Sequence, residues 1–550
     1  MMLKRTNHFK PVILLVMLFT GILSTKAHDF EFGGIYYNLE GNEAIVTFRG
    51  TYSAEYNEYF GDVTIPATVT YNGTTYPVTA IGGMAFYECR DLTRVSLPNS
   101  VDSIAYNSFY GCSGLTSITI PSSVTYMEDF SFAKCSSLKT LYYNAKNCED
   151  MNWGWRVFWN SPIESVIIGE GVEKIPAEFL EECSNVQSLV IPNSVTYIGA
   201  GAFDDTEWYN NQPDGLVYAG LIAYKYKGSM PNGTMITFKS GTIGIASSAF
   251  YDCSDLAGIT IPNSVTTIGC YTFWNCTGLT SVIIPNSVSF IGEDAFERCR
   301  GLTNVVLSNS LSSLEYRVFM ECTSLKHITI PNSVTHIEQA AFSGCTGLTS
   351  VDIPNSVTVI GRAAFANCYS LNNVIIPNSV TRIRDSAFSD CSGLTNLVIG
   401  ESVAIIEPLA FDGCSSLKSI TIPKSVTEIG QEAFASCSGL INITCLADTP
   451  PQTDIAIFYR DCYDNATLYV PINSIVAYKA AFIWGHFSHI VGISTNSGDV
   501  NIDGEINISD INAVIDIILS GIINLSGDVN RDGEVNISDV NTIIDIILSL

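Results

Sequence analysis

The sequence is poor in charge, and above all in basic residues. Lys and Arg total 27 against 54 Asp and Glu, charged residues make up 15% of the chain, and the formal net charge is -27. Nucleic-acid binding needs clusters of Lys and Arg that release counterions from phosphates. No such cluster is present, so a nucleic acid is excluded as a partner.

Catalytic motifs are missing as well. The chain has no G-x-S-x-G, no H-E-x-x-H and no Walker A loop. Five His residues remain beyond residue 27, namely His28, His327, His336, His486 and His489. They are scattered among repeats and aromatic segments, where a packed or exposed role is expected. Because no non-repetitive segment has the size of a catalytic domain, we expect a protein that is not an enzyme.

Long hydrophobic runs are absent except near the N-terminus. Lys4, Arg5 and Lys10 precede a short apolar run at 12–23, and a cleavage-site-like stretch of small residues follows and ends at Ala27. This pattern is typical of a secretory signal peptide at 1–27. The alternative, an uncleaved anchor, needs a longer run to cross a bilayer. We therefore expect a secreted or cell-surface protein with no membrane span after signal removal.

The chain repeats with a period of 23 residues. Pro262, Pro285, Pro331, Pro354, Pro377 and Pro423 are separated by 23 residues or multiples of 23, each within a variant of IPNSVT. A fixed period of this size predicts a solenoid, in which each coil buries its apolar face only against its neighbours.

One coil, residues 348–370, shows how the repeat works. Leu348, Val351 and Ile353 give L-x-x-V-x-I, the strand signature of leucine-rich repeats, and Pro354 ends the strand because it cannot donate to a ladder. Further along the coil, Ala364, Phe365 and Cys368 have the spacing of about one turn of helix with one buried face. The repeat therefore predicts an α/β solenoid of the leucine-rich-repeat type.

Cysteine is abundant, but its spacing argues against disulfides. Twelve coils carry F-x-x-C, two more carry one extra residue, and 14 of the 17 Cys are therefore repeat positions. Stacked coils place such residues in one column about 4.8 Å apart, which predicts a ladder of buried thiols that pack as small apolar groups. A disulfide framework is the alternative, although one column offers no pairing scheme. Cys148, Cys270 and Cys445 lie off the ladder, and a Cys445–Cys462 bond is left open.

The composition divides the chain into six segments. They are a signal peptide at 1–27, a β-rich N-terminal cap at 28–80, the solenoid at 81–444, a C-terminal cap at 445–493, a linker at 494–498 and a separate module at 499–550. Caps are expected because the open ends of a solenoid would otherwise expose its core.

Two aromatic-rich stretches, 142–160 and 206–235, interrupt the period. Insertions in solenoids often emerge on a binding face. Candidate ligand-binding aromatics are Trp153, Trp155, Trp159, Trp208 and Tyr209, whose rings could stack on sugars or anchor a protein. The alternative, which we favour, is that these rings pack the insertions onto the solenoid.

The repeats resemble the BspA-like class of bacterial leucine-rich repeats. The resemblance rests on I-P-x-S-V-T-x-I-G, A-F-x-x-C and L-T-x-V-x-I, and covers about residues 30–493. It implies adhesion to host proteins or to other bacteria, with a surface protein or a glycan as ligand.

The last segment carries two nearly identical 12-residue loops, DVNIDGEINISD at 499–510 and DVNRDGEVNISD at 528–539. Calcium prefers six to eight oxygen ligands, which such a loop supplies at alternating positions, with Gly at position 6. The candidate ligands are Asp499, Asn501, Asp503, Glu505 through its carbonyl, Asn507 and Asp510, and then Asp528, Asn530, Asp532, Glu534 through its carbonyl, Asn536 and Asp539. We expect two Ca²⁺ ions; the alternative is an acidic turn without metal.

Each loop leads into an amphipathic helix, and no helix precedes it. The predicted apolar faces are Ile511, Val514, Ile515, Ile518 and Leu519 in the first helix, and Val540, Ile543, Ile544, Ile547 and Leu548 in the second. The sequence therefore predicts a small α-helical module made of two half EF-hands.

This module resembles a type I dockerin over its whole length. The resemblance implies calcium-dependent binding to a cohesin-type domain, with Ile508, Ser509, Ile537 and Ser538 at the positions that select the partner. Their identity in both halves implies two docking orientations. A monomeric adhesion protein is the first hypothesis for the whole chain. An accessory or catalytic subunit of a polysaccharide-degrading, cellulosome-like complex is the second.

Overall fold

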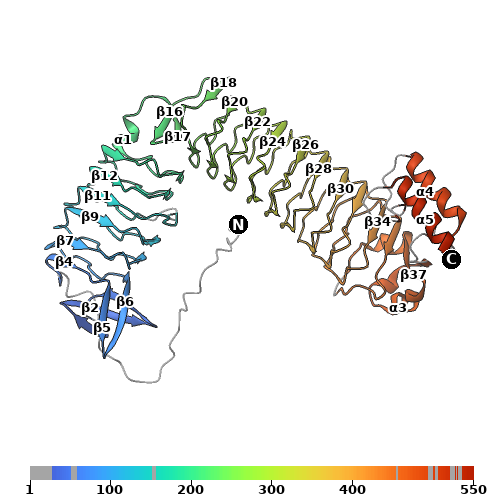
Figure 1. Ribbon diagram of the computed structural model, residues 1–550, viewed down its shortest axis with the longest axis horizontal. Coiled ribbons are helices and arrows are strands. Elements are labelled where there is room, and N and C mark those ends of the chain that lie inside the picture. Colours follow the sequence, from blue (N-terminus) through green and yellow to red (C-terminus); the bar gives the residue numbers. More distant parts are fainter. Residues whose placement is uncertain are drawn as a thin grey trace. The chain divides into compact units, whose positions relative to one another are not determined.

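The computed structural model describes residues 28–50, 58–150, 156–453, 456–493, 500–501, 506–520, 527, 529 and 535–549. The chain divides into two compact units, Met1–Lys139 with Arg156–Pro162 and Thr140–Trp155 with Ile163–Leu550 (Figure 1). The predicted signal peptide lies outside the described residues. Within the described part of the chain, no helix is both long and apolar enough to cross a membrane.

The first unit opens with antiparallel strands that close one end of the stack. β1 (Phe30–Phe32), β2 (Ile35–Glu40) and β3 (Glu43–Thr47) pair antiparallel, as do β5 (Thr68–Tyr71) and β6 (Thr74–Ile81). From β6 onward neighbouring strands pair in parallel: β6 pairs with β8 (Ser103–Ile104), and β8 pairs with β10 (Tyr126–Met127). In the same way β4 (Gly61–Thr64) pairs in parallel with β7 (Leu92–Ser96). The remaining strand of this unit is β9 (Ser117–Ile120).

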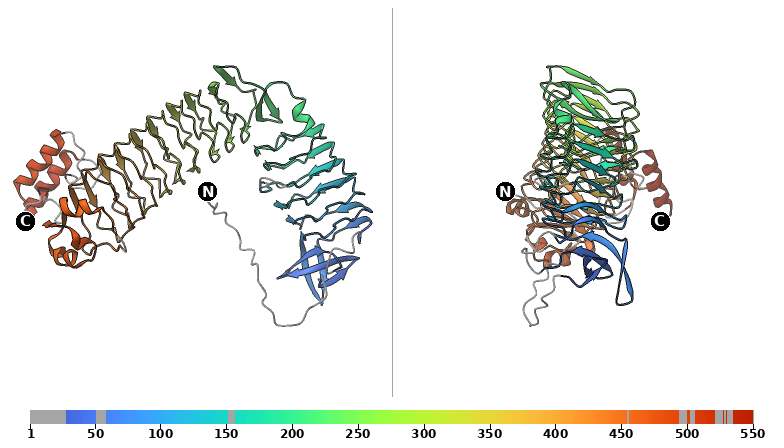
Figure 2. Two further views of the ribbon diagram at one scale, coloured as in Figure 1. Left: turned by 180° about the vertical axis from the view of Figure 1, so that it is seen from behind. Right: turned by 90° about the vertical axis from the view of Figure 1, so that its left-hand side faces the viewer.

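In the second unit each regular coil contributes two short strands, and equivalent strands pair in parallel one repeat apart. Ser350 of β28 is paired with Asn373 of β30, and Ile337 of β27 with Ile360 of β29. The structure is a β-solenoid of about 18 turns, with repeats about 23 residues apart. Seen from behind, the strands of successive coils follow one another along the stack (Figure 2).

The strands of the regular coils form two series. The L-x-x-V-x-I series comprises β11 (Thr140–Tyr143), β12 (Ser165–Ile168), β14 (Ser188–Val190), β18 (Thr234–Thr237), β20 (Leu256–Thr260), β22 (Ser281–Ile283), β24 (Asn304–Val306), β26 (His327–Thr329), β28 (Ser350–Asp352), β30 (Asn373–Ile375), β32 (Asn396–Val398), β34 (Ser419–Ile422) and β36 (Asn442–Cys445). The second series comprises β13 (Lys174–Ile175), β15 (Tyr197–Ile198), β19 (Gly244–Ile245), β21 (Thr267–Ile268), β23 (Phe290–Ile291), β25 (Ser313–Leu314), β27 (His336–Ile337), β29 (Val359–Ile360), β31 (Arg382–Ile383), β33 (Ile405–Ile406) and β35 (Glu428–Ile429).

The segment that carries Phe and Cys is not a helical turn, as the spacing had suggested. In the coil around Phe365, both Ala363 and Asn367 have positive φ, 52° and 61°. Left-handed residues cannot continue a right-handed helix. The N–H groups of Ala363, Phe365 and Asn367 instead donate to carbonyls of the next coil at 2.8–2.9 Å, while Ala366 donates back to Ala363. Two tight turns thus replace the helix, and the coil stays bonded to its neighbour along this edge as well.

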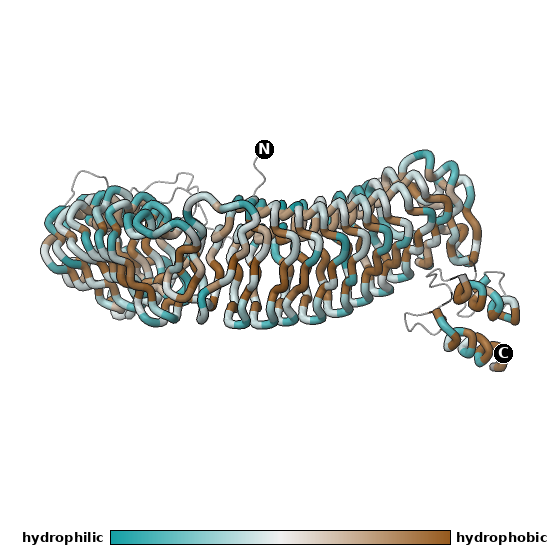
Figure 3. The backbone as a smooth tube through the Cα atoms, turned by 90° about the horizontal axis from the view of Figure 1, so that it is seen from above, coloured by the Kyte–Doolittle hydropathy of each residue, from teal (hydrophilic) through white to brown (hydrophobic). Residues whose placement is uncertain are grey.

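The core consists of columns of identical side chains. The Phe rings from Phe250 to Phe458 stack with centroids 5.0–5.6 Å apart and interplanar angles of 4–20°. In the first unit Phe86, Phe109, Phe132 and Phe158 form a similar column. Apolar positions recur at the same place in successive coils (Figure 3), as the 23-residue period requires.

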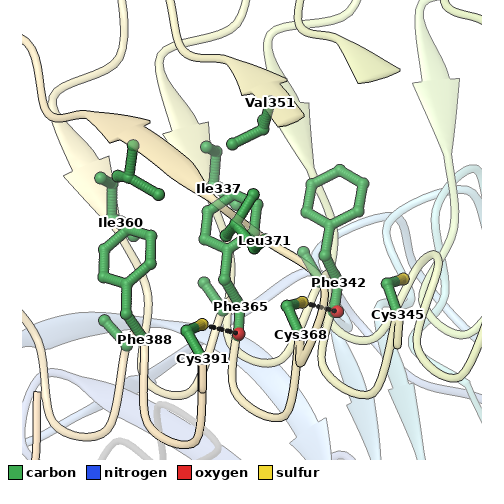
Figure 4. Packing of buried hydrophobic residues seen from close by; sticks show 14 of the residues in the cluster. Ile337, Phe342, Cys345, Val351, Ile360, Phe365, Cys368, Leu371, Phe388 and Cys391 are labelled. Atoms are coloured by element: carbon green, nitrogen blue, oxygen red, sulfur yellow. Dashed lines mark hydrogen bonds between the residues drawn. The ribbon is translucent and has the colours of Figure 1, made fainter. Parts of the chain in front are cut away.

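The thiol column does more than fill space. In ten coils the Cys Sγ donates to the carbonyl oxygen of the Phe in the preceding coil, at 3.0–3.4 Å; Figure 4 shows two of these bonds, Cys368 to Phe342 and Cys391 to Phe365. Where Ser161 replaces Cys, its hydroxyl donates to Phe132 at 2.7 Å. Serine can therefore take the place of the thiol because both side chains donate the same bond.

All 17 Cys residues are free thiols. The disulfide alternative for the ladder is thus not realised, and Cys445 and Cys462 are not joined. Cys445 is buried, and Tyr478 donates its hydroxyl hydrogen to the sulfur at 3.1 Å.

The second unit ends in a mixed cap. β36 pairs in parallel with β37 (Thr467–Pro471), which in turn pairs in parallel with β38 (His489–Ile493). The cap also contains the helices α2 (Arg460–Asn465) and α3 (Ile475–Ala480) and the 3-10 turns Ile472–Ser474 and Trp484–His486. Trp484 is buried, and its indole N–H donates to the carbonyl of Pro451 at 3.0 Å. Large aromatic side chains thus cover the core where the repeat stops.

Candidate functional site

The C-terminal module is built on two 13-residue helices, α4 (Ile508–Ser520) and α5 (Ile537–Ser549). They pack against each other through a small core in which Val514 and Ile543 are fully buried. Of the predicted calcium ligands the structure describes Asn501, Asn507, Asp510, Asn536 and Asp539. The others, Asp499, Asp503, Glu505, Asp528, Asn530, Asp532 and Glu534, lie outside the described residues.

Asp510 organises the first loop from the first turn of α4. Its side chain is buried, Oδ1 accepts the N–H of Asn501 at 3.0 Å, and Oδ2 accepts the N–H of Asn507 at 2.8 Å. Asn501 and Asn507 are therefore both bonded to one carboxylate. The N-terminal end of a helix also favours a negative charge at this position.

The second half repeats this arrangement. Asp539 is equally buried, Oδ1 accepts the N–H of Val529 at 2.7 Å, and Oδ2 accepts the N–H of Asn536 at 2.9 Å. A carboxylate oxygen that accepts one N–H retains a lone pair for a second partner. Buried carboxylates at position 12 of an oxygen-rich loop fit a hard cation such as Ca²⁺. Among the described residues, which leave out seven of the predicted ligands, no group of three or more His, Cys, Asp or Glu side chains could hold a metal ion.

The predicted apolar faces of the two helices are only partly buried. Val514 and Ile543 point into the module, as expected, but Ile515 and Leu519 of α4 and Ile544 and Leu548 of α5 are exposed. A module of two helices has one inner side and cannot cover so wide an apolar stripe, so part of each face stays exposed. The periodicity shows that these residues are apolar, but not which of them find a partner.

The exposed residues form a matched surface on each helix. Ile508, Ile515 and Leu519 recur as Ile537, Ile544 and Leu548. Ile508 and Ile537 are 72% and 69% exposed, and Leu519 and Leu548 are 78% and 79% exposed. Ile508 and Ile537 are predicted partner-contacting residues, and each surface continues from them along its helix for about three turns. We call these surfaces the α4 face and the α5 face.

The other predicted partner residues, Ser509 and Ser538, are tied to the loops. The Ser509 N–H and hydroxyl both donate to Asn507 Oδ1 at 2.8 Å, and Asn501 Nδ2 donates to the Ser509 hydroxyl at 2.5 Å. The Ser538 N–H donates to Asn536 Oδ1 at 2.8 Å. The residues expected to bind metal thus contact those expected to bind the partner.

The aromatics of the second insertion pack inward. The insertion forms α1 (Glu207–Asn210) and an antiparallel hairpin of β16 (Gly215–Ala219) and β17 (Ile222–Lys227) (Figure 1). Tyr209 is buried edge-on against Tyr224, and Trp208 lies edge-on to Phe203. Lys227 Nζ lies over the Tyr209 ring and donates to the carbonyls of Asn210, the last residue of α1, and Gln212. This packing favours the alternative in which these rings hold the insertion in place.

Trp159, from the first insertion, is half-buried. Its ring is edge-on to Phe130, and Lys134 Nζ lies 5.3 Å from the ring centroid. Trp153 and Trp155 lie outside the described residues. The candidate ligand aromatics are therefore not gathered into one site among the described residues.

Comparison with known proteins agrees with this architecture. The BspA type leucine rich repeat region matches residues 56–154, 151–212, 223–349 and 336–468, and the dockerin type I domain matches residues 497–548. No curated protein matches the chain. A type I dockerin is a calcium-binding domain and implies a cohesin partner.

Solved bacterial structures are similar along most of the chain. A leucine-rich repeat protein from Bacteroides ovatus is 26% identical, with 81% of this chain and 95% of that chain covered and a TM-score of 0.39. A leucine rich cell surface protein from Faecalibacterium prausnitzii is 27% identical, with 76% and 94% covered and a TM-score of 0.31. The chain belongs to the family of BspA type leucine rich repeat proteins and carries a C-terminal type I dockerin domain.

Proposed function

We propose that this protein is a secreted or cell-surface binding protein whose dockerin attaches it, in a calcium-dependent way, to a cohesin-type domain. The observation that carries the proposal is the pair of matched apolar surfaces, the α4 face and the α5 face. Exposed apolar surfaces of this kind mark interaction sites in soluble proteins. Each face is repeated in sequence and in exposure, so either can meet the same partner.

The two acidic loops are the proposed calcium sites. Asp510 and Asp539 are buried and ionisable, and each receives two backbone N–H groups. Loss of the cation would leave the acidic side chains of each loop to repel one another. We propose one Ca²⁺ per loop, held by the ligand sets named above, which fixes Asn507 and Asn536 and through them Ser509 and Ser538.

The solenoid supplies the second binding activity. Leucine-rich repeats and dockerins are non-catalytic modules, and the stacked coils display long columns of exposed side chains over a rigid core. We propose that this surface binds a host or bacterial surface protein or a glycan. A non-catalytic subunit of a polysaccharide-degrading complex is the second candidate, favoured by the dockerin alone.

The test is capture of the full-length protein on immobilised type I cohesin domains, with calcium or with EDTA. We expect capture by at least one cohesin with calcium, and its loss with EDTA. A matched variant, Asp510→Ala/Asp539→Ala, should behave in calcium as the parent does in EDTA. Capture that is indifferent to EDTA, or failure of the whole cohesin panel, would contradict the proposal.

A further inference from the structure

Two aromatic side chains stack outside the core, in consecutive coils. The rings of Tyr251 and Trp274 are parallel within 7°, with centroids 4.5 Å apart, and the Arg298 guanidinium lies 5.3 Å from the Trp274 centroid. Tyr251 and Trp274 each follow a core Phe in the repeat. Their side chains therefore leave the coil on the outside of the turn, where the Phe points inward.

The same order of side chains occurs in the first unit. Tyr87 and Tyr110 occupy the same repeat positions, with centroids 5.0 Å apart and an interplanar angle of 2°, and Lys134 Nζ lies 5.1 Å from the Tyr110 centroid. Each series begins in a coil that follows an irregular segment, the N-terminal cap or the β16–β17 hairpin.

The first ring of the second stack has an open face. Tyr251 is 46% exposed although Trp274 covers one side of its ring. The Tyr226 N–H donates to the Ala249 carbonyl at 2.8 Å, so the end of the hairpin runs beside this coil. This bond is the one that a core Phe makes to the next coil, so Tyr226 stands in the Phe position and Lys227 in the position that precedes Tyr251 in the column. Lys227 Nζ lies over the Tyr209 ring and donates to the carbonyls of Asn210 and Gln212, so this ammonium group is engaged at α1.

The polar groups beside the stack are acceptors and amides. Asn275 Nδ2 donates to Asp252 Oδ1 at 2.5 Å, beside Tyr251 and Trp274 in the same two coils. The nearby cations are engaged: Arg298 is 3.4 Å from the carboxylates of Glu297 and Glu321, Lys225 pairs with Asp204, and Lys227 donates to main-chain carbonyls. This environment accepts hydrogen bonds from hydroxyl groups, but it offers an anionic ligand no uncompensated positive charge.

We propose that Tyr251 is a subsite for a neutral pyranose ring of a glycan. The sugar stacks on the open face of the Tyr251 ring, and its hydroxyls donate to the Asp252 carboxylate beside that ring. Aromatic rings that present an apolar face next to polar groups provide such amphipathic contacts. The inference rests on the proposed binding role of the solenoid and names its ligand class.

The experiment is native affinity electrophoresis of the full-length protein through gels that contain soluble β-glucan, xyloglucan, galactomannan or α-mannan, with polygalacturonate as the acidic probe. We expect at least one neutral polysaccharide to retard the protein. Tyr251→Ala should weaken that retardation at least about tenfold, whereas Tyr251→Phe retains the ring and should weaken it less than about threefold.

Tyr369→Ala is the matched control, because Tyr369 is 49% exposed and belongs to neither stack. Its retardation should equal that of the parent. All variants should have the thermal unfolding midpoint of the parent, which shows that they are folded. The inference is overturned if no neutral polysaccharide retards the protein, if only polygalacturonate does, or if Tyr251→Ala behaves as Tyr369→Ala. Calcium-dependent cohesin capture of Tyr251→Ala, measured in parallel, is expected to be unchanged, so failure of the glycan subsite is distinguished from failure of the dockerin proposal.

Discussion

The thiol of Cys368 donates a hydrogen bond to the main-chain carbonyl of Phe342, one coil earlier, with sulfur and oxygen 3.3 Å apart. The same bond recurs along the ladder, so each Cys joins its own turn to the backbone of its neighbour. The same carbonyl also accepts the N–H of Cys345 at 3.1 Å, so the thiol provides its second hydrogen bond. The column is therefore both a packing element and a set of cross-coil bonds.

Substitution of one ladder thiol should separate these two roles. Cys345→Ala removes both the volume and the bond to Phe319, and we expect a cost of about 1–3 kcal/mol. Cys345→Ser keeps a donor, as Ser161 does naturally, and should cost less. Thermal unfolding followed by circular dichroism measures both. Equal midpoints for the two variants would show that the bond contributes nothing.

The ladder thiols should be chemically inert in the folded protein. Burial raises the pKa of Cys345, Cys299 and Cys391 to about 12, so these groups stay protonated at pH 8, and thiols react as thiolates. Iodoacetamide at pH 8 should label the half-exposed Cys253, Cys270 and Cys462 first, two of which are the partly exposed ends of the ladder, and all 17 thiols only after denaturation. Mass spectrometry of intact protein and of peptides gives the count. Rapid labelling of the buried ladder positions, or cross-linked peptides, would contradict the structure.

Glu178 should make stability depend on pH. Burial, and then the nearby Glu181 and Asp204, raise the pKa of Glu178 to about 7. The folded state therefore holds a proton that the unfolded state releases, and stability falls as pH rises from about 4.5 to 7. Glu178→Gln should leave the thermal midpoint unchanged at pH 4 and raise it at pH 8.

The control for this experiment is Glu428→Gln, because Glu428 is exposed on β35. Its midpoint should follow that of the parent at both pH values. If the Glu178→Gln substitution raised the thermal midpoint no more at pH 8 than at pH 4, Glu178 would not be the group whose raised pKa lowers stability.

The two faces of the dockerin should substitute for each other. Ile508→Asp or Ile537→Asp alone disables one of two equivalent surfaces, so cohesin affinity should fall only about twofold. The double variant should lose about 100-fold or more, because both apolar surfaces then carry a charge. Isothermal titration with the cohesin selected by capture measures this. If a single variant abolished cohesin binding, only one of the two faces would bind the cohesin, and the prediction would be wrong.

Calcium titration provides the control for that prediction. Ile508→Asp/Ile537→Asp leaves every predicted ligand in place and should bind calcium as the parent does. A loss of calcium binding would instead attribute the effect to misfolding of the module.

The sequence by itself determined the solenoid, its period and the columns, because residues repeated at a fixed spacing can only be buried by stacking. It also determined the two loops, since alternating oxygen donors with Gly504 and Gly533 at position 6 are written in the residues themselves. The free state of the ladder thiols followed from the same repetition.

Only the tertiary structure decided what each side chain meets. Periodicity around Phe365 could not distinguish a helical turn from two turns with left-handed residues, since both bury Phe and Cys while the backbone bonds differ. Nor could it tell that Leu519 is exposed while Val514 is buried, because both are apolar and only the position of the second helix separates them. The open face of Tyr251 depends on the hairpin that replaces the preceding coil. The exposed fraction of a side chain depends on residues that are distant in sequence, and only the packing of the folded chain fixes where those residues lie.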